Sequence, residues 1–173
     1  MARGAASKTS GLAFGTSSAT SGDDASDTGF WLLCRAGSHR FALPMPHVIE
    51  NMRMLPIESV AGAPPVVRGL CIIRGAPVPV VDAALLFEDR SARCERLVTV
   101  RTGSRTIAFA AEAVLGVHAI TAQALEQLPP LFRNVESIAA VATLDEELVF
   151  FLHTARIIPD DFLVDSNADG APA

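Results

Sequence analysis

Apolar residues in this chain occur in short runs separated by turn-forming residues. The runs 30–34 and 39–43 flank Ala-Gly-Ser at 36–38, which predicts a β-hairpin with a glycine-containing loop. Similar runs continue from 66–73 to 148–154. No long stretch repeats with the 3.6-residue period of an extended amphipathic helix. The pattern therefore predicts about nine or ten short strands.

This spacing indicates an all-β protein. Turn signals recur about every ten residues, as in β-barrels and β-sandwiches. A parallel βαβ sheet would need a long crossover helix between its strands, and the pattern contains none. We expect short helices only, over 45–52, 83–87 and 122–128. Asp82 directly precedes the second of these and is a candidate N-cap.

The chain divides into an apolar central domain over 30–162 and two polar ends. Residues 1–29 are rich in Ser, Ala, Gly and Thr, which predicts a disordered tail, and 163–173 form a predicted flexible C-terminal tail. The N-terminal segment lacks the continuous apolar region of a signal peptide, so we expect a cytoplasmic protein. The polar stretch 88–96 is the candidate boundary between two lobes. These predicted lobes cover about 30–88 and about 95–162.

Composition argues against several classes of function. Apolar residues make up 50% of the chain, too many for a protein that is disordered throughout. No apolar run reaches the roughly 18 residues of a membrane-spanning helix, so we expect no membrane insertion. The net charge of −5 opposes non-specific nucleic-acid binding. An oligonucleotide-binding barrel is an alternative, but it stacks bases on aromatic residues, and this chain has one Trp and no Tyr.

Residues that usually carry catalysis or bind metals form no recognisable motif here. The three cysteines are widely spaced and the four histidines share no ligand spacing, so we expect no metal site. Cys34 and Cys71 lie in apolar runs and are expected to pack as small hydrophobic residues. Cys94, between Arg93 and Glu95, is the thiol on which the alternative of a cysteine enzyme depends. We expect no catalytic residue and no cofactor.

The span 64–82 is more distinctive, because two Arg-Gly pairs interrupt a β-rich run. Gly69 and Gly75 mark bulges or tight turns where a side chain would not fit. Arg74 follows a run of apolar residues, and a charge held beside a core usually has a partner. We hypothesise that Glu50 is this partner.

These segments resemble the CheW family of chemotaxis coupling proteins. Phe41-Ala-Leu-Pro44 matches the family's aromatic-x-hydrophobic-Pro, and Val48-Ile-Glu50 matches its Val-x-Glu. Within 65–75, the chain matches Gly-hydrophobic-x-Asn-hydrophobic-Arg-Gly, with Ile72 in place of the Asn. Val78-Pro-Val-Val-Asp82 matches hydrophobic-Pro-hydrophobic-hydrophobic-Asp. The match weakens in the second half of the chain.

The resemblance covers about residues 30–162. It implies two small five-stranded β-barrel lobes packed together, without catalytic activity or cofactor. It also implies a scaffold that couples the cytoplasmic tip of methyl-accepting chemoreceptors to the regulatory domain of a sensor histidine kinase. The receptor tip would lie in an apolar groove between the lobes, and the exposed ends of the barrels would pair with the kinase. The resemblance implies neither nucleic-acid binding nor membrane insertion.

The resemblance further implies which residues contact or support the partners. The partner-binding or supporting residues are Val48, Glu50, Val67, Gly69 and Arg74, and the structural motif residues are Gly75, Pro79 and Asp82. An Asn at position 72 could satisfy backbone groups in a turn, whereas Ile72 cannot. The alternative function is therefore a CheW-like adaptor of a diverged array that controls twitching or gliding motility or development.

Overall fold

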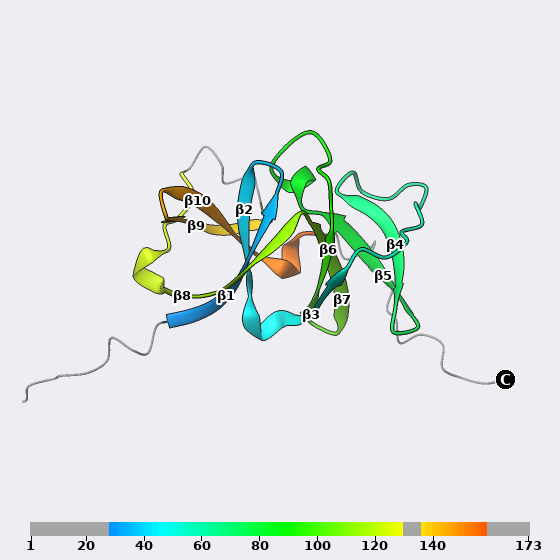
Figure 1. Ribbon diagram of the computed structural model, residues 1–173, viewed down its shortest axis with the longest axis horizontal. Helices are drawn as coiled ribbons and strands as arrows, with labels where there is room; N and C mark the ends of the chain where they lie inside the picture. Colours follow the sequence, from blue (N-terminus) through cyan, green and yellow to red (C-terminus); the bar gives the residue numbers. More distant parts are fainter. Residues whose placement is uncertain (1–27, 130–135, 159–173) are drawn as a thin grey trace, which may run out of the picture.

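The computed structural model describes residues 28–129 and 136–158, which form ten strands in two five-stranded sheets. In sheet A the strands follow the order β8 (Ala113–Thr121), β1 (Thr28–Ala36), β2 (His39–Pro44), β10 (Glu147–Leu152) and β9 (Ile138–Leu144). In sheet B the order is β3 (Val48–Arg53), β6 (Arg96–Thr102), β7 (Arg105–Ala111), β5 (Ala76–Asp82) and β4 (Val67–Ile73). Figure 1 shows sheet A on the left and sheet B on the right. The predicted all-β fold with two groups of five strands is confirmed.

The helices of the described residues are 3₁₀-helices of three residues each: η1 (Met45–His47), η2 (Ala84–Leu86), η3 (Ala122–Ala124) and η5 (Thr154–Arg156). This confirms the expectation of short helices only. The prediction of a longer helix over 45–52 is wrong beyond its first turn, because Val48 begins β3 and pairs with Val100 of β6. Pairing in the sheet satisfies the backbone groups of this segment, whereas an isolated two-turn helix is marginal in water.

The sheets do not correspond to the two halves of the chain. Sheet B is built from the continuous stretch 48–111, and sheet A combines the first two strands with the last three. The prediction of one lobe over 30–88 and the other over 95–162 is therefore wrong. The polar stretch 88–96 joins β5 to β6 within sheet B, because a polar composition marks a surface connection and not necessarily a domain boundary.

The predicted tails lie almost entirely outside the described residues. Thr28 and Gly29 belong to β1, where they pair with Thr121 and Ile120 of β8, so the predicted tail of 1–29 extends too far. The remaining N-terminal residues and the predicted tail 163–173 are not described.

Neither sheet is a barrel closed by strand pairing, because the outer strands of each sheet do not pair with each other among the described residues. Two isolated bridges instead cover one outer strand of each sheet. Glu58 exchanges two backbone hydrogen bonds of 2.8 Å with Leu70 of β4. Glu126 does the same with Val141 of β9, at 2.7 and 2.9 Å. β8 and β3 are therefore the outer strands that no such bridge covers within the described ranges.

Three apolar clusters form the core, one within each sheet and one between the two sheets. One is the core of sheet B, including Cys71, Val80 and Leu97, and one is the core of sheet A, including Leu33 and Phe151. The third fills the space between the sheets, and its buried side chains include Phe41, Leu43, Val67, Val81, Val98, Val100, Ile107 and Phe109. The central strands are thus buried on both faces, which explains why they read as continuous apolar runs.

Candidate partner-binding site

Glu50 and Arg74 form an ion pair in sheet B, as the sequence suggested. Nε of Arg74 donates to Oε1 of Glu50 at 2.9 Å, and Nη2 donates to Oε2 at 2.8 Å. Glu50 lies on β3, whereas Arg74 lies in the turn between β4 and β5, at the other end of the strand order. The bidentate pair therefore links the two sides of the open sheet, with the Arg74 side chain 78% exposed.

The β4–β5 turn places Arg74 in this position. Ile73 and Ala76 are the last cross-strand pair, so Arg74 and Gly75 form a two-residue loop. Both residues have positive φ, 52° and 82°, as the tightest hairpin turns require. A Cβ at Gly75 would meet no atom within 4 Å, so this glycine serves the backbone conformation and not a close approach. The left-handed conformation of Arg74 costs roughly 1–2 kcal/mol, which the turn must accommodate.

The two charges of the pair stabilise each other. Hydrogen bonding to Arg74 lowers the pKa of the Glu50 carboxyl below its ordinary value, and hydrogen bonding to Glu50 raises the pKa of Arg74. Water and salt screen a pair this exposed, so its main effect is to fix the geometry of the turn.

The neighbouring candidates Val48, Val67 and Gly69 lie on strands β3 and β4 and contribute mainly to packing. Val67 is buried between the sheets, and Val48 packs against the same cluster. Gly69 lies at the bulge of β4, with a φ of 146°, and a Cβ built there would lie 1.9 Å from the backbone oxygen of Glu58. This confirms that a side chain would not fit at Gly69. Val67 and Gly69 therefore shape the edge of sheet B and present little surface of their own.

The remaining motif residues lie on β5, Pro79 in its middle and Asp82 at its end. Pro79 faces Leu70 in a part of β5 that precedes its pairing with β7. Asp82 is fully buried, and its Oδ1 accepts a hydrogen bond from the backbone N–H of Ala84 at 3.0 Å. Its Oδ2 accepts a hydrogen bond from the Ser91 hydroxyl. The prediction of Asp82 as the N-cap is wrong by one residue, because η2 begins at Ala84 and its N-cap is Ala83. Asp82 instead binds the N–H of the first helical residue from one position further back.

Ile72 does not lie in the turn. It faces Pro77 across the β4–β5 hairpin and is 64% exposed. The replacement of the family Asn therefore changes an exposed side chain on the hairpin surface and removes no turn contact. Burial alternates along β4, and Ile72 occupies one of the exposed positions of that alternation.

Sequence reasoning missed an exposed apolar face on sheet A. Phe30 of β1 is 60% exposed and Val117 of β8 is 53% exposed. They lie on one side of the sheet, because Phe30 pairs with Ala119 and Val117 pairs with Leu32. Leu32 belongs to the cluster between the sheets, so this face continues that core to the surface. We call Phe30, Val117 and Ala119 the apolar face.

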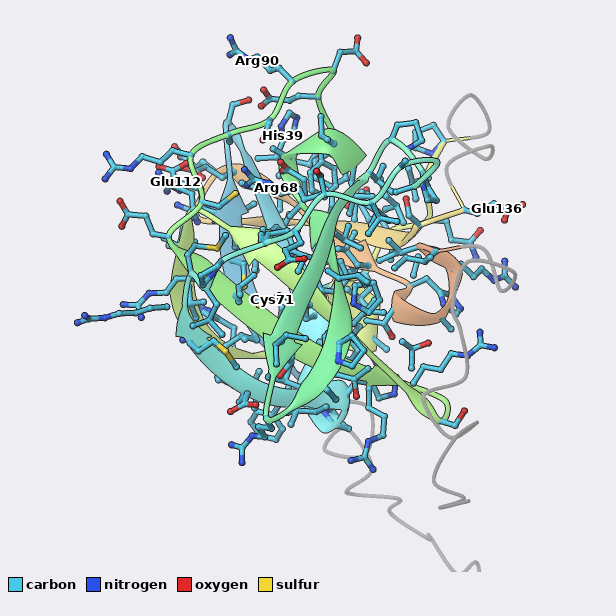
Figure 2. All side chains as sticks on the ribbon, turned by 90° about the vertical axis from the view of Figure 1, so that its right-hand side faces the viewer. His39, Arg68, Cys71, Arg90, Glu112 and Glu136 are labelled. Atoms are coloured by element: carbon cyan, nitrogen blue, oxygen red, sulfur yellow. The ribbon has the colours of Figure 1, made fainter. Side chains whose placement is uncertain are left out.

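The cysteines offer no activated nucleophile. Burial raises the pKa of the Cys34 thiol to about 12 and also raises the pKa of Cys71, which lies inside sheet B (Figure 2). At Cys94, desolvation and then the Asp82 carboxylate raise the pKa. Each thiol therefore favours its protonated, unreactive form near neutral pH. Among the described residues, no group of three His, Cys, Asp or Glu side chains is arranged to hold a metal ion.

The comparisons with known proteins agree on the architecture. The family model of the CheW-like domain matches residues 31–162. Among solved structures, the scaffolding protein TtCheW from Thermoanaerobacter tengcongensis is similar, with a TM-score of 0.64 and 19% sequence identity. That match covers 72% of this chain and 83% of the other, and at this identity it shows the fold alone. No curated protein sequence matches. Across the described ranges, no helix is both long and apolar enough to cross a membrane.

Proposed function

The chain belongs to the family of CheW-like domains, the non-catalytic scaffolds of chemosensory signalling, and on this premise we propose that it couples chemoreceptors to a sensor histidine kinase. The proposed partners are the cytoplasmic tip of a methyl-accepting chemoreceptor and the regulatory domain of the kinase, so the protein would act in the cytoplasm. The observation that carries the proposal is the apolar face of sheet A. An adaptor must present at least two surfaces, and this face is distinct from the ion-paired edge of sheet B.

The apolar face suits the receptor tip. A helical hairpin docks through a few apolar side chains into a surface with a polar rim. Phe30 and Val117 supply large exposed apolar groups that continue from the buried core between the sheets. Exposed apolar groups of this kind on a folded protein are typical of interaction sites.

The edge of sheet B suits the kinase. Ile49 of β3 and Ile72 of β4 are exposed, and the pair of Glu50 and Arg74 fixes the β4–β5 turn. Apolar side chains beside a positioned charge pair give contact area together with a defined orientation. We therefore assign the kinase to β3 and the β4–β5 hairpin, and the receptor tip to β1 and β8.

Calorimetric titration of the full chain with each partner from the same genome tests this assignment. We expect micromolar binding, about −8 kcal/mol, to both the receptor tip and the kinase regulatory domain. Val117→Asp should weaken only receptor binding, and Ile72→Asp should weaken only kinase binding, since each places a charge in one apolar contact.

Leu148→Asp is the matched control, because Leu148 is 50% exposed and lies on β10, outside both surfaces. Failure of the parent protein to bind either partner would reject the coupling function. Equal loss of both affinities in all three variants would reject the assignment of separate surfaces.

A further inference from the structure

The connection between β5 and β6 reaches sheet A, although both of its strands belong to sheet B. It leaves β5 after Asp82, forms η2 and returns to β6 at Arg96. In Figure 1 this green segment lies beside the turn between β1 and β2. Figure 2 shows Arg90 of this connection and His39 of β2 at the same end of the molecule.

Glu88 makes the polar contacts to sheet A. Its Oε1 accepts a hydrogen bond from the backbone N–H of Ser38 at 3.0 Å and another from the Ser38 hydroxyl. The same oxygen lies 3.1 Å from Nδ1 of His39. Ser38 lies in the β1–β2 turn and His39 begins β2, so one carboxylate oxygen of the connection contacts the turn at two points and β2 at one.

Phe87 makes the apolar contacts to sheet A. Its ring lies nearly parallel to that of His39, with centroids 5.4 Å apart and an angle of 23°. The ring centroids of Phe87 and Phe150 lie 5.0 Å apart, and those of Phe87 and Phe41 lie 6.1 Å apart. The three neighbours come from β2 and β10, so Phe87 bridges two strands of sheet A.

The start of the connection is firmly attached to sheet B and to the core between the sheets. Ala83 and Ala84 are fully buried in that core. Asp82, the last residue of β5, binds the backbone of Ala84 and the hydroxyl of Ser91, on either side of the pair that contacts sheet A. Phe87 and Glu88 therefore lie on a segment whose base cannot move independently of sheet B.

We propose that Phe87 and Glu88 form a clasp that fixes the position of sheet A relative to sheet B and thereby positions the apolar face. The clasp holds β1 at its Ala36 end, whereas Phe30 lies about 20 Å away along the same strand. A small rotation of sheet A about the clasped end therefore displaces Phe30 and Val117 relative to sheet B. Phe87 and Glu88 are positioning residues that contact neither proposed partner. The inference rests on the proposed function, because the surface that the clasp positions is the proposed receptor site.

Spin-label distance measurements on the full chain test the clasp without any partner. Labels at Ser104→Cys, in the β6–β7 turn, and Thr121→Cys, at the end of β8, report on the two sheets in a Cys94→Ser background. We expect a narrow distance distribution in this parent. The variant with Phe87→Ala and Glu88→Ala should give a broader distribution with a shifted mean, at a temperature where circular dichroism shows it folded.

Two matched variants separate the clasp from the rest of the connection. Arg93→Ala and Glu95→Ala remove exposed side chains of the same segment, at 85% and 55% exposure, that pair with each other and not with Glu88, and should leave the distribution narrow. If the double variant does not fold, Ser38→Ala is measured instead, since it removes the hydroxyl contacts to Glu88 and His39 and keeps the backbone hydrogen bond to Glu88. An unchanged distribution in a folded clasp variant overturns the proposal, as does equal broadening in the controls.

Titration with the receptor tip then links the clasp to the proposed function. Receptor affinity should fall severalfold in the clasp variant and remain unchanged in Arg93→Ala. A broadened distribution with unchanged affinity would show that the clasp holds the sheets but does not position the receptor site, which overturns that part of the proposal. If the parent does not bind the receptor tip, the proposed function fails, and the distance distributions still decide whether the clasp exists.

Discussion

The two sheets share one arrangement of strands but differ in their uncovered outer strands. In sheet A the outer strand β8 pairs with β1 of the β1–β2 hairpin, and β2 pairs in parallel with β10. In sheet B the outer strand β3 pairs with β6 of the β6–β7 hairpin, and β7 pairs in parallel with β5. β3 has six residues and carries Glu50 and Arg53. β8 has nine residues and no Asp, Glu, Lys or Arg. Similar architecture thus presents one charged edge and one apolar edge.

This difference separates two ways of managing an open sheet edge. Charged side chains on a short outer strand discourage pairing with foreign strands, and the bond between Glu50 and Arg74 also fixes the open side of sheet B. On β8, Gly116 with a φ of 132° lies beside a register shift that breaks the regular edge, while Val117 remains exposed. The comparison indicates that charged side chains protect the β3 edge of sheet B from pairing with other strands, whereas the β8 edge of sheet A keeps an exposed apolar surface for a partner.

The largest effect on stability is expected where the edge of sheet B has no room for a side chain. Gly69→Ala places a Cβ 1.9 Å from the backbone oxygen of Glu58, at a φ of 146°. The covering bridge of β4 must then separate, and we expect a loss of about 3 kcal/mol or more in the free energy of unfolding. Urea denaturation followed by circular dichroism measures this loss.

Gly103→Ala is the control for that measurement. Gly103 also has a positive φ, 63°, but a Cβ there would meet no atom within 4 Å. Its substitution should cost only about 1–2 kcal/mol, from the backbone conformation alone. Equal losses in the two variants would contradict the role of the close approach at Gly69.

The next effect is expected at the buried end of β5. Asp82→Ala leaves the N–H of Ala84 and the hydroxyl of Ser91 without their acceptor, in a site that excludes water. We expect a loss of about 2 kcal/mol in the free energy of unfolding. Asp82→Asn retains the acceptor for Ala84 and should lose less. Thermal unfolding of both variants tests the order, and a smaller loss in Asp82→Ala would contradict it.

The success and failure of sequence interpretation follow from what local pattern encodes. Strand number and the absence of long helices could be predicted, because apolar runs and turn residues are local signals. The close contact at Gly69 and the partner of Arg74 could also be inferred, since a glycine in a β-branched run and a charge beside a core each demand a local explanation. These features depend on few distant contacts.

The features that the sequence did not reveal depend on pairing between segments that are distant in the chain. The exchange of strands between the halves leaves no mark in composition, so the stretch 88–96 looked like a boundary. The runs containing Phe30 and Phe41 look alike in sequence, yet Phe41 is buried in a central strand and Phe30 is exposed next to the outer strand β8. Only the strand order distinguishes them. The contacts of Phe87 and Glu88 with sheet A were invisible for the same reason.

A pH titration of stability tests the contact between the two sheets at the Glu88 carboxyl. Hydrogen bonds from Ser38, first from its hydroxyl and then from its backbone, lower the pKa of Glu88 from 4.5 to about 2. A carboxyl whose pKa is lower in the folded state stabilises that state fully above its unfolded pKa, and this contribution is lost as pH falls toward the folded value. Stability should therefore fall between pH 4.5 and 2 more steeply in the parent than in Glu88→Gln. Parallel stability curves for the two proteins would show that Glu88 contributes nothing through its charge.

The smallest effect on stability, but a selective effect on binding, is expected at Glu50 and Arg74. Glu50→Ala and Arg74→Ala each break an exposed pair, so overall stability should change little, while the β4–β5 turn loses its fixed orientation. Kinase binding should weaken and receptor binding should remain. Trp31, the single tryptophan, lies in sheet A with its ring 4.8 Å from that of Phe151, so its fluorescence reports on sheet A alone. Native fluorescence together with lost kinase affinity is the expected result. A shifted Trp31 spectrum would show instead that the pair supports the whole fold, and that the two edges are not independent.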